Sequence, residues 1–177
     1  PDGLVTDRRR RIKVLDCTIR DGGICNDWAF SKEQVRNTFN SLVEAGIDYM
    51  EIGYKTAEGL FDPSKVGPWK FSKEEDLREV VEEGKIRLAT MVDIGRIDLA
   101  ALQPASESVV DVIRIATYAH QMDDALRILD RALEQGYETF MNVMAVSTLE
   151  PKEVDTFLNR LAASGVHNVA LVDSFGA

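Results

Sequence analysis

The chain has 177 residues, of which 45% are hydrophobic and 29% charged, a composition typical of a globular domain with a sizeable core. Its formal net charge of -9 argues against a nucleic-acid partner, because phosphate binding needs a basic surface. The two cysteines are too few for a disulfide framework, and no apolar run approaches the ~20 residues that span a bilayer. We therefore expect reduced thiols, a cytoplasmic location and no membrane contact.

The first apolar run is predicted to form a strand that ends in a charged pair. Residues 1–11 carry a basic run and are expected to form a solvated N-terminal arm. The strand predicted at 12–17 leads directly to Arg20 and Asp21, which two glycines follow. An aspartate at a strand end suits Mg²⁺ or Mn²⁺, and an adjacent arginine suits a carboxylate or a developing enolate. A purely structural ion pair explains the same two residues equally well.

Helical patterns alternate with apolar, β-rich runs along the rest of the chain. Ser31 with Gln34, and Ser72 with Glu75, have the spacing of a helix capping box, and Pro151 is suited to a first helical turn. A glycine, which readily closes a helix, ends each of four helical patterns. These glycines are Gly46, Gly84, Gly136 and Gly165.

The alternation predicts an α/β protein with a parallel sheet whose two faces are covered. A long loop is expected from 55 to 71. Two architectures fit the pattern: an open doubly wound sheet, which six strands would complete, and a (β/α)8 barrel, of which they would supply six units. Six strands are expected near residues 12–17, 47–53, 86–93, 109–116, 138–146 and 168–173.

In both architectures ligands bind beyond the carboxyl ends of the strands, so polar residues there are candidates for a site. His120 follows the fourth strand and is the nearby candidate for a general base that titrates near neutrality. The remaining candidates for substrate binding are Glu51, Asn142, Asp173 and Ser174.

Several motifs at these strand ends resemble the DRE-TIM metallolyases, a family of metal-dependent pyruvate aldolases and acyl-CoA lyases and synthases. TIRDGG (18–23) resembles the signature that closes their first strand, and MEIGY (50–54) resembles their second strand. KIRLAT, VIRIATYAHQMDDA and LVDSFGA are similar to the third, fourth and sixth strands of the 4-hydroxy-2-oxovalerate aldolase branch. The resemblance covers residues 12–177.

This resemblance implies a TIM (β/α)8 barrel, of which residues 1–177 would form about six units of a single domain. It implies a divalent metal, Mn²⁺ or Mg²⁺, with Asp21 as a ligand and Arg20 steadying the enolate oxygen. Asp173 and Ser174 match a pair that lies beside the substrate. The expected reaction makes or breaks a carbon–carbon bond next to a 2-oxo acid, with the metal as Lewis acid.

The sequence departs from the family pattern at three places. Ile24 replaces the catalytic histidine of the aldolases, and Tyr118 stands where their fourth strand has a histidine, with His120 two residues later. The family's two metal-binding histidines lie on a seventh strand, which we expect outside the 177 residues. An acyl-CoA-dependent enzyme of the same barrel and an inactive barrel used as an interaction module therefore stay open, as does a homo-oligomer.

Overall fold

The computed structural model describes residues 12–176, so the predicted N-terminal arm lies outside the described residues. Strands and helices alternate through this part of the chain, and short 3₁₀ turns join several of them. No helix within residues 12–176 is both long enough and apolar enough to cross a membrane. The strands are β1 (Leu15–Asp16), β2 (Tyr49–Tyr54), β3 (Arg87–Asp93), β4 (Val112–Thr117), β5 (Glu138–Val143) and β6 (Asn168–Leu171); the helices are α2 (Thr18–Gly22), α3 (Lys32–Glu44), α4 (Glu74–Val80), α5 (Met122–Glu134) and α6 (Pro151–Ala162).

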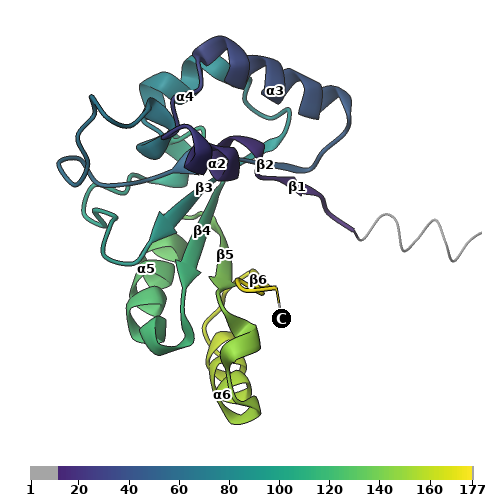
Figure 1. Cartoon of the computed structure of the whole chain (residues 1–177), viewed down its shortest axis with the longest axis vertical. Helices are drawn as coiled ribbons and strands as arrows, with labels where there is room; N and C mark the ends of the chain where they lie inside the picture. Colours follow the sequence, from purple (N-terminus) through teal and green to yellow (C-terminus); the bar gives the residue numbers. More distant parts are fainter. Residues whose placement is uncertain (1–11, 177) are drawn as a thin grey trace, which may run out of the picture.

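All six strands are parallel and lie in the order β1-β2-β3-β4-β5-β6, as the sequence predicted for a parallel sheet. A doubly wound sheet has a point at which the strand order reverses, and this sheet has none. The sheet curls into a half-barrel, with α3, α4, α5 and α6 on its outer side (Figure 1). The barrel prediction is therefore confirmed for the part of the fold that these strands form.

The helix boundaries follow most of the predicted signals. Ser31 accepts a hydrogen bond from the Gln34 backbone at 3.1 Å, and the Gln34 side chain accepts one from the Ser31 backbone, which completes the capping box. Pro151 is the first residue of α6, also as predicted. The capping box at Ser72 is wrong: α4 begins at Glu74, and the buried Ser72 hydroxyl donates to the Trp69 carbonyl instead.

Three predicted helix ends lie at glycines with left-handed backbones, and one helix stops early. Gly46, Gly136 and Gly165 have φ of 70°, 84° and 78° and close α3, α5 and α6. Helix α4 stops at Val80 instead of running to Gly84, because Val81 turns to an extended conformation and packs against the core.

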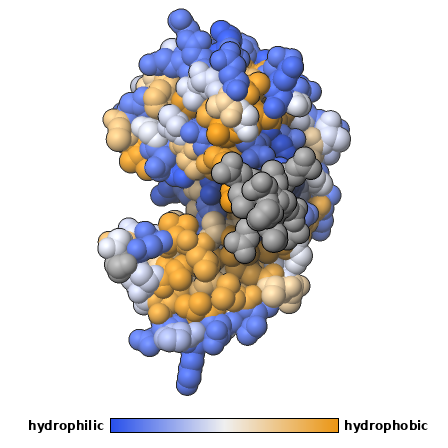
Figure 2. All heavy atoms as spheres, turned by 90° about the vertical axis from the view of Figure 1, so that its right-hand side faces the viewer, coloured by the Kyte–Doolittle hydropathy of each residue, from blue (hydrophilic) through white to orange (hydrophobic). Residues whose placement is uncertain are grey.

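The main hydrophobic core lies between the outer face of the sheet and the helices. From α3 it takes Val35 and Phe39, and from α6 it takes Phe157 and Leu161. Leu158, also on α6, is 37% exposed. It is one of several exposed apolar residues in the α6–β6 part of the chain, and Figure 2 shows an apolar surface in the lower part of the molecule. The others are Val169, Leu171 and Phe175.

A β-bulge in β2 and the segment that packs on it shape the carboxyl end of the sheet. The register between β2 and β3 shifts between Glu51 and Gly53, so Glu51 and Tyr54 both face the inner side although they are three residues apart. Residues 67–72 cross the outer side of the bulge so closely that a Cβ at Gly53 would lie 2.0 Å from the Trp69 carbonyl oxygen. Only glycine fits at this position.

We predict that Gly53→Ala lowers the free energy of unfolding by about 1–3 kcal/mol, because the added methyl group forces the 67–72 segment away from β2. Urea denaturation measures this loss. Gly22→Ala is the matched control, since its Cβ would meet Phe30 at an ordinary 3.4 Å within a helix. Equal stability of the two variants would contradict the close packing at Gly53.

Candidate active site

The TIRDGG segment folds as one turn of helix and not as the end of a strand. Strand β1 stops at Asp16, whose carboxylate accepts hydrogen bonds from the Thr18 backbone at 3.0 Å and from the Thr18 hydroxyl at 2.8 Å. These local bonds compete with the sheet and start α2, so the first strand is shorter than the predicted 12–17 and Arg20 lies on a helical turn. Helix α2 instead places Arg20 over the inner face of the neighbouring strand.

Three charged side chains meet at the inner face of the half-barrel. Arg20 donates from Nε to Oε2 of Glu51 at 2.6 Å, and Nη1 of Arg114 reaches the same oxygen at 2.7 Å. Arg114 lies on the same face of β4 as Val112 and Ala116, since side chains two residues apart in a strand point to the same side. Val112 and Ala116 belong to small clusters that are separate from the helix-covered core. The two arginines and Glu51 therefore form a buried ionic network, and Glu51 joins its two cations.

The network is almost completely removed from water. The Glu51 side chain is 0% exposed. The two guanidinium groups therefore replace the water that would otherwise stabilise its carboxylate. Burial lowers the pKa of Arg20, but attraction and hydrogen bonding to Glu51 outweigh it and hold that pKa above its ordinary value. Burial and the nearby Glu51 raise the pKa of the Cys17 thiol, which receives a long contact of 3.6 Å from Arg114. Glu51 thus holds Arg20 as a cation.

Two polar atoms of this network are buried and have no hydrogen-bond partner among residues 12–176. They are Oε1 of Glu51 and Nε of Arg114. A third contact of the network is longer, since Arg114 donates to the Asn142 side chain at 3.3 Å. The exposed Asp21 also pairs with Arg20, so the buried part of the inner face holds two cations, one carboxylate and an unused hydrogen-bond donor, the Nε of Arg114. It is chemically suited to an anionic ligand.

Sequence reasoning found Glu51, Arg20 and Asn142 but missed Arg114. In the structure Arg20 and Arg114 both contact Glu51, and Arg114 links this pair to Asn142. A signal was available, because Arg114 interrupts the apolar run VIRIAT in the middle of a strand, where a cation is expected only if it is paired. Arg114 was missed because the candidates were taken from the carboxyl ends of the strands, and Arg114 lies in the middle of a strand.

Asp173 and Ser174 lie together at the ends of β5 and β6. The Ser174 hydroxyl accepts from the Ala145 backbone at 3.0 Å, and Asp173 accepts from the Ser147 hydroxyl at 2.7 Å. Asp173 also accepts from the backbones of residues 175 and 176. These bonds fix the chain as it leaves the sixth strand, and the role of both residues beside a substrate stays a prediction.

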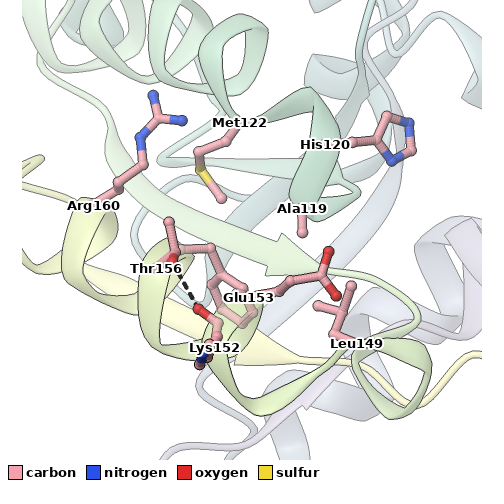
Figure 3. Close-up of a pocket in the computed structure, with 9 residues that line it drawn as sticks. Ala119, His120, Met122, Leu149, Lys152, Glu153, Thr156 and Arg160 are labelled. Carbon is pink, nitrogen blue, oxygen red and sulfur yellow. Dashed lines mark hydrogen bonds between the residues drawn. The ribbon is translucent and has the colours of Figure 1, made fainter.

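His120 lies on the outer side of the fold. It lines a pocket of about 340 Å³ between the start of α5 and α6, and Figure 3 shows it at the rim, with Arg160 on the opposite side. Its ring stacks on Tyr118 at 5.6 Å between centroids. Within residues 12–176 no hydrogen bond or ion pair links His120 to Arg20, Glu51 or Arg114. Its role as a base stays a prediction.

Asp21 offers a single accessible carboxylate for a metal ion. Its side chain is 65% exposed and pairs with Nη1 of Arg20 at 2.9 Å. Among the described residues, no three His, Cys, Asp or Glu side chains are grouped so that they could hold an ion. These residues therefore do not form a metal site by themselves, and Asp21 could serve only as one ligand of a larger set.

Comparison with known proteins agrees with the fold and the motifs. The chain is 26% identical over 175 residues to 4-hydroxy-2-oxovalerate aldolase 6 of Rhodococcus jostii (strain RHA1), covering 96% of this chain and 48% of that protein. It is 27% identical over 176 residues to oxaloacetate decarboxylase of Mycobacterium tuberculosis (strain ATCC 25618 / H37Rv), covering 98% and 51%. No protein-family model matches the chain.

A solved structure resembles the half-barrel as a whole. The N-terminal domain of a candidate aldolase from Bacteroides vulgatus superposes with a TM-score of 0.69 at 23% identity, over 91% of this chain and 62% of that one. At this identity the match concerns the fold alone. The chain spans about half the length of the curated relatives it matches. Its resemblance to the DRE-TIM metallolyases is thereby confirmed, and over nearly its whole length the chain is related to their 4-hydroxy-2-oxovalerate aldolases.

Proposed function

We propose that this chain is part of a lyase that cleaves or forms a carbon–carbon bond next to a 2-oxo acid, through an enolate of the pyruvate type. The observation that carries the proposal is the pair of buried arginines, Arg20 and Arg114, that share one oxygen of Glu51. The names of the related aldolases and of oxaloacetate decarboxylase support it, since those names describe reactions of 2-oxo acids. We also propose that the 177 residues belong to one barrel domain.

We assign to Arg20 the stabilisation of the negative charge that develops in the transition state. Cleavage of the bond next to the oxo group leaves an electron pair that moves onto the oxo oxygen, so this oxygen gains charge in the transition state. A guanidinium held in place by Glu51 needs no reorganisation to meet that charge, which is the basis of electrostatic catalysis. Asn142 and the unpaired Nε of Arg114 are the groups proposed to hold the substrate's carboxylate.

A divalent metal, Mn²⁺ or Mg²⁺, is proposed as the cofactor, with Asp21 as one oxygen ligand. Because the described residues do not complete a site, the remaining ligands must come from elsewhere in the protein or from the substrate. When bound, such an ion would supply Lewis-acid stabilisation of the enolate. The base that takes the hydroxyl proton is assigned to His120, as an untested proposal, because Ile24 has no titratable group.

The full-length protein that contains this chain should release pyruvate from a 4-hydroxy-2-oxo acid when Mn²⁺ or Mg²⁺ is present. In Arg20→Lys the turnover number should fall about 100-fold while the Michaelis constant changes little, because the lost contact matters most in the transition state. A coupled assay for pyruvate measures both constants. The control is Arg127→Lys, since Arg127 is exposed on α5 and should tolerate the same exchange. Unchanged turnover in Arg20→Lys would remove Arg20 from the chemistry.

Metal binding is tested separately at Asp21. Asp21→Asn should weaken the binding of Mn²⁺ to the full-length protein at least tenfold, because a neutral amide oxygen is a poorer ligand for a hard cation than a carboxylate. Calorimetry with the metal alone gives the affinity. Asp27→Asn is the matched control, since its left-handed backbone suits asparagine. If both variants bind Mn²⁺ as the unmodified protein does, Asp21 is not a ligand.

A further inference from the structure

Lys70 is a buried lysine in the long loop between β2 and α4. Only 3% of the residue is exposed, although lysine is among the residues least often buried. The 67–72 segment fixes its position, because this segment packs on the β2 bulge and Gly67 lies directly against the backbone of Trp28. A lysine held rigidly out of water needs an explanation in terms of what its ammonium group contacts.

The contacts of the Lys70 ammonium group are aromatic. Its Nζ atom lies 4.0 Å from the ring centroid of Trp28, 4.0 Å from that of Tyr54 and 4.9 Å from that of Phe61. Among residues 12–176 no carboxylate forms an ion pair with it. The opposite charge that acts on it is that of Asp93, which is already paired with Arg96 at 3.1 Å.

Aromatic rings compensate only part of the solvation that a buried ammonium group loses. A cation–π contact contributes about 0.5–2 kcal/mol, whereas the loss of water around a buried ion costs several times more. In agreement with this, burial lowers the pKa of Lys70, and Arg96 adds to the effect while Asp93 opposes it. An anionic ligand that reached Lys70 would therefore stabilise its buried ammonium group.

The rings around Lys70 also border the buried ionic network. Trp28 donates from its indole nitrogen to the Arg20 carbonyl at 2.8 Å, and it lies edge-to-face against Tyr54 at 5.4 Å between centroids. Tyr54 is close enough to Arg20 for that guanidinium to lower the pKa of the tyrosine, although burial raises it overall. Lys70 is therefore one side chain away from the arginine that we assign to the enolate.

We propose that Lys70 binds a second carboxylate of the substrate, so that the 2-oxo acid taken by this site is a dicarboxylate. This inference rests on the proposed function. Arg20 and Arg114 would engage the 2-oxo acid end of the substrate, and Lys70 would meet the acid group at the other end. The aromatic rings of Trp28 and Tyr54 would line the carbon chain between them.

The test compares acids that differ only in their second carboxylate. Calorimetry with the full-length protein and Mg²⁺ measures the affinities for 2-oxopentanoate against 2-oxoglutarate, and for 2-oxobutanoate against oxaloacetate. In at least one pair the dicarboxylate should bind about tenfold to hundredfold more tightly, as expected for a hydrogen-bonded charge pair. In Lys70→Met this preference should vanish while the affinity for the monocarboxylate stays within about twofold. Lys70→Arg, which keeps the charge, should retain part of it.

The outcomes separate this inference from the function on which it depends. If monocarboxylates bind but neither pair shows a preference, or if Lys70→Met keeps the preference, Lys70 has no role in recognition and the proposed function stands. If no 2-oxo acid binds the unmodified protein, the proposed function fails and this inference fails with it. Circular dichroism and the monocarboxylate affinity show whether Lys70→Met has kept its fold.

Discussion

The arrangement of the half-barrel depends on one buried carboxylate. Glu51 has lost all contact with water, and two guanidinium groups from distant parts of the sequence replace it. One comes from the helical turn after β1 and the other from the middle of β4, so the ionic network joins three elements across the sheet. Removing either arginine would leave a buried charge without sufficient compensation, which typically costs about 3–5 kcal/mol. The same interaction thus stabilises the fold and fixes the geometry of the site.

This constraint also explains why the site is suited to anions. Glu51 holds both guanidinium groups through a single oxygen, and within the described part of the chain its other oxygen and the Arg114 Nε atom have no hydrogen-bond partner. A well-paired structural ion network would be expected to use these atoms, because unpaired buried polar groups are destabilising. The bulge in β2 adds to the arrangement by turning Tyr54 toward the same side as Glu51, where its ring meets Lys70. Three largely buried cations, Arg20, Arg114 and Lys70, therefore lie in this part of the fold, although the chain as a whole is acidic.

Much of this could be read from the sequence, because the signals were local. Helix caps, glycine turns and nearly continuous apolar strands depend on neighbouring residues, and they gave the six parallel strands correctly. The choice between the two sheet architectures depends on strand order, which periodicity does not contain. Arg114 and Lys70 were missed because the role of a charged side chain depends on its neighbours in space. Arg114 pairs with Glu51, which is 63 residues away in sequence, and Lys70 contacts Trp28, which is 42 residues away. The helical turn at Arg20 was missed because the Asp16 side chain ends the strand early.

The central claim, that the Arg20–Glu51–Arg114 network stabilises an enolate, is tested most directly by hydrogen exchange at pyruvate. In D₂O with Mg²⁺ or Mn²⁺, the full-length protein should catalyse loss of the pyruvate methyl signal in the proton NMR spectrum, because formation of the enolate releases a methyl proton to solvent. The measurement needs no knowledge of the aldehyde partner. The account predicts exchange well above the rate with metal alone, and strongly reduced exchange in Arg20→Lys, which keeps a positive charge beside Glu51. Exchange no faster than with metal alone, in a protein that binds pyruvate, would contradict it.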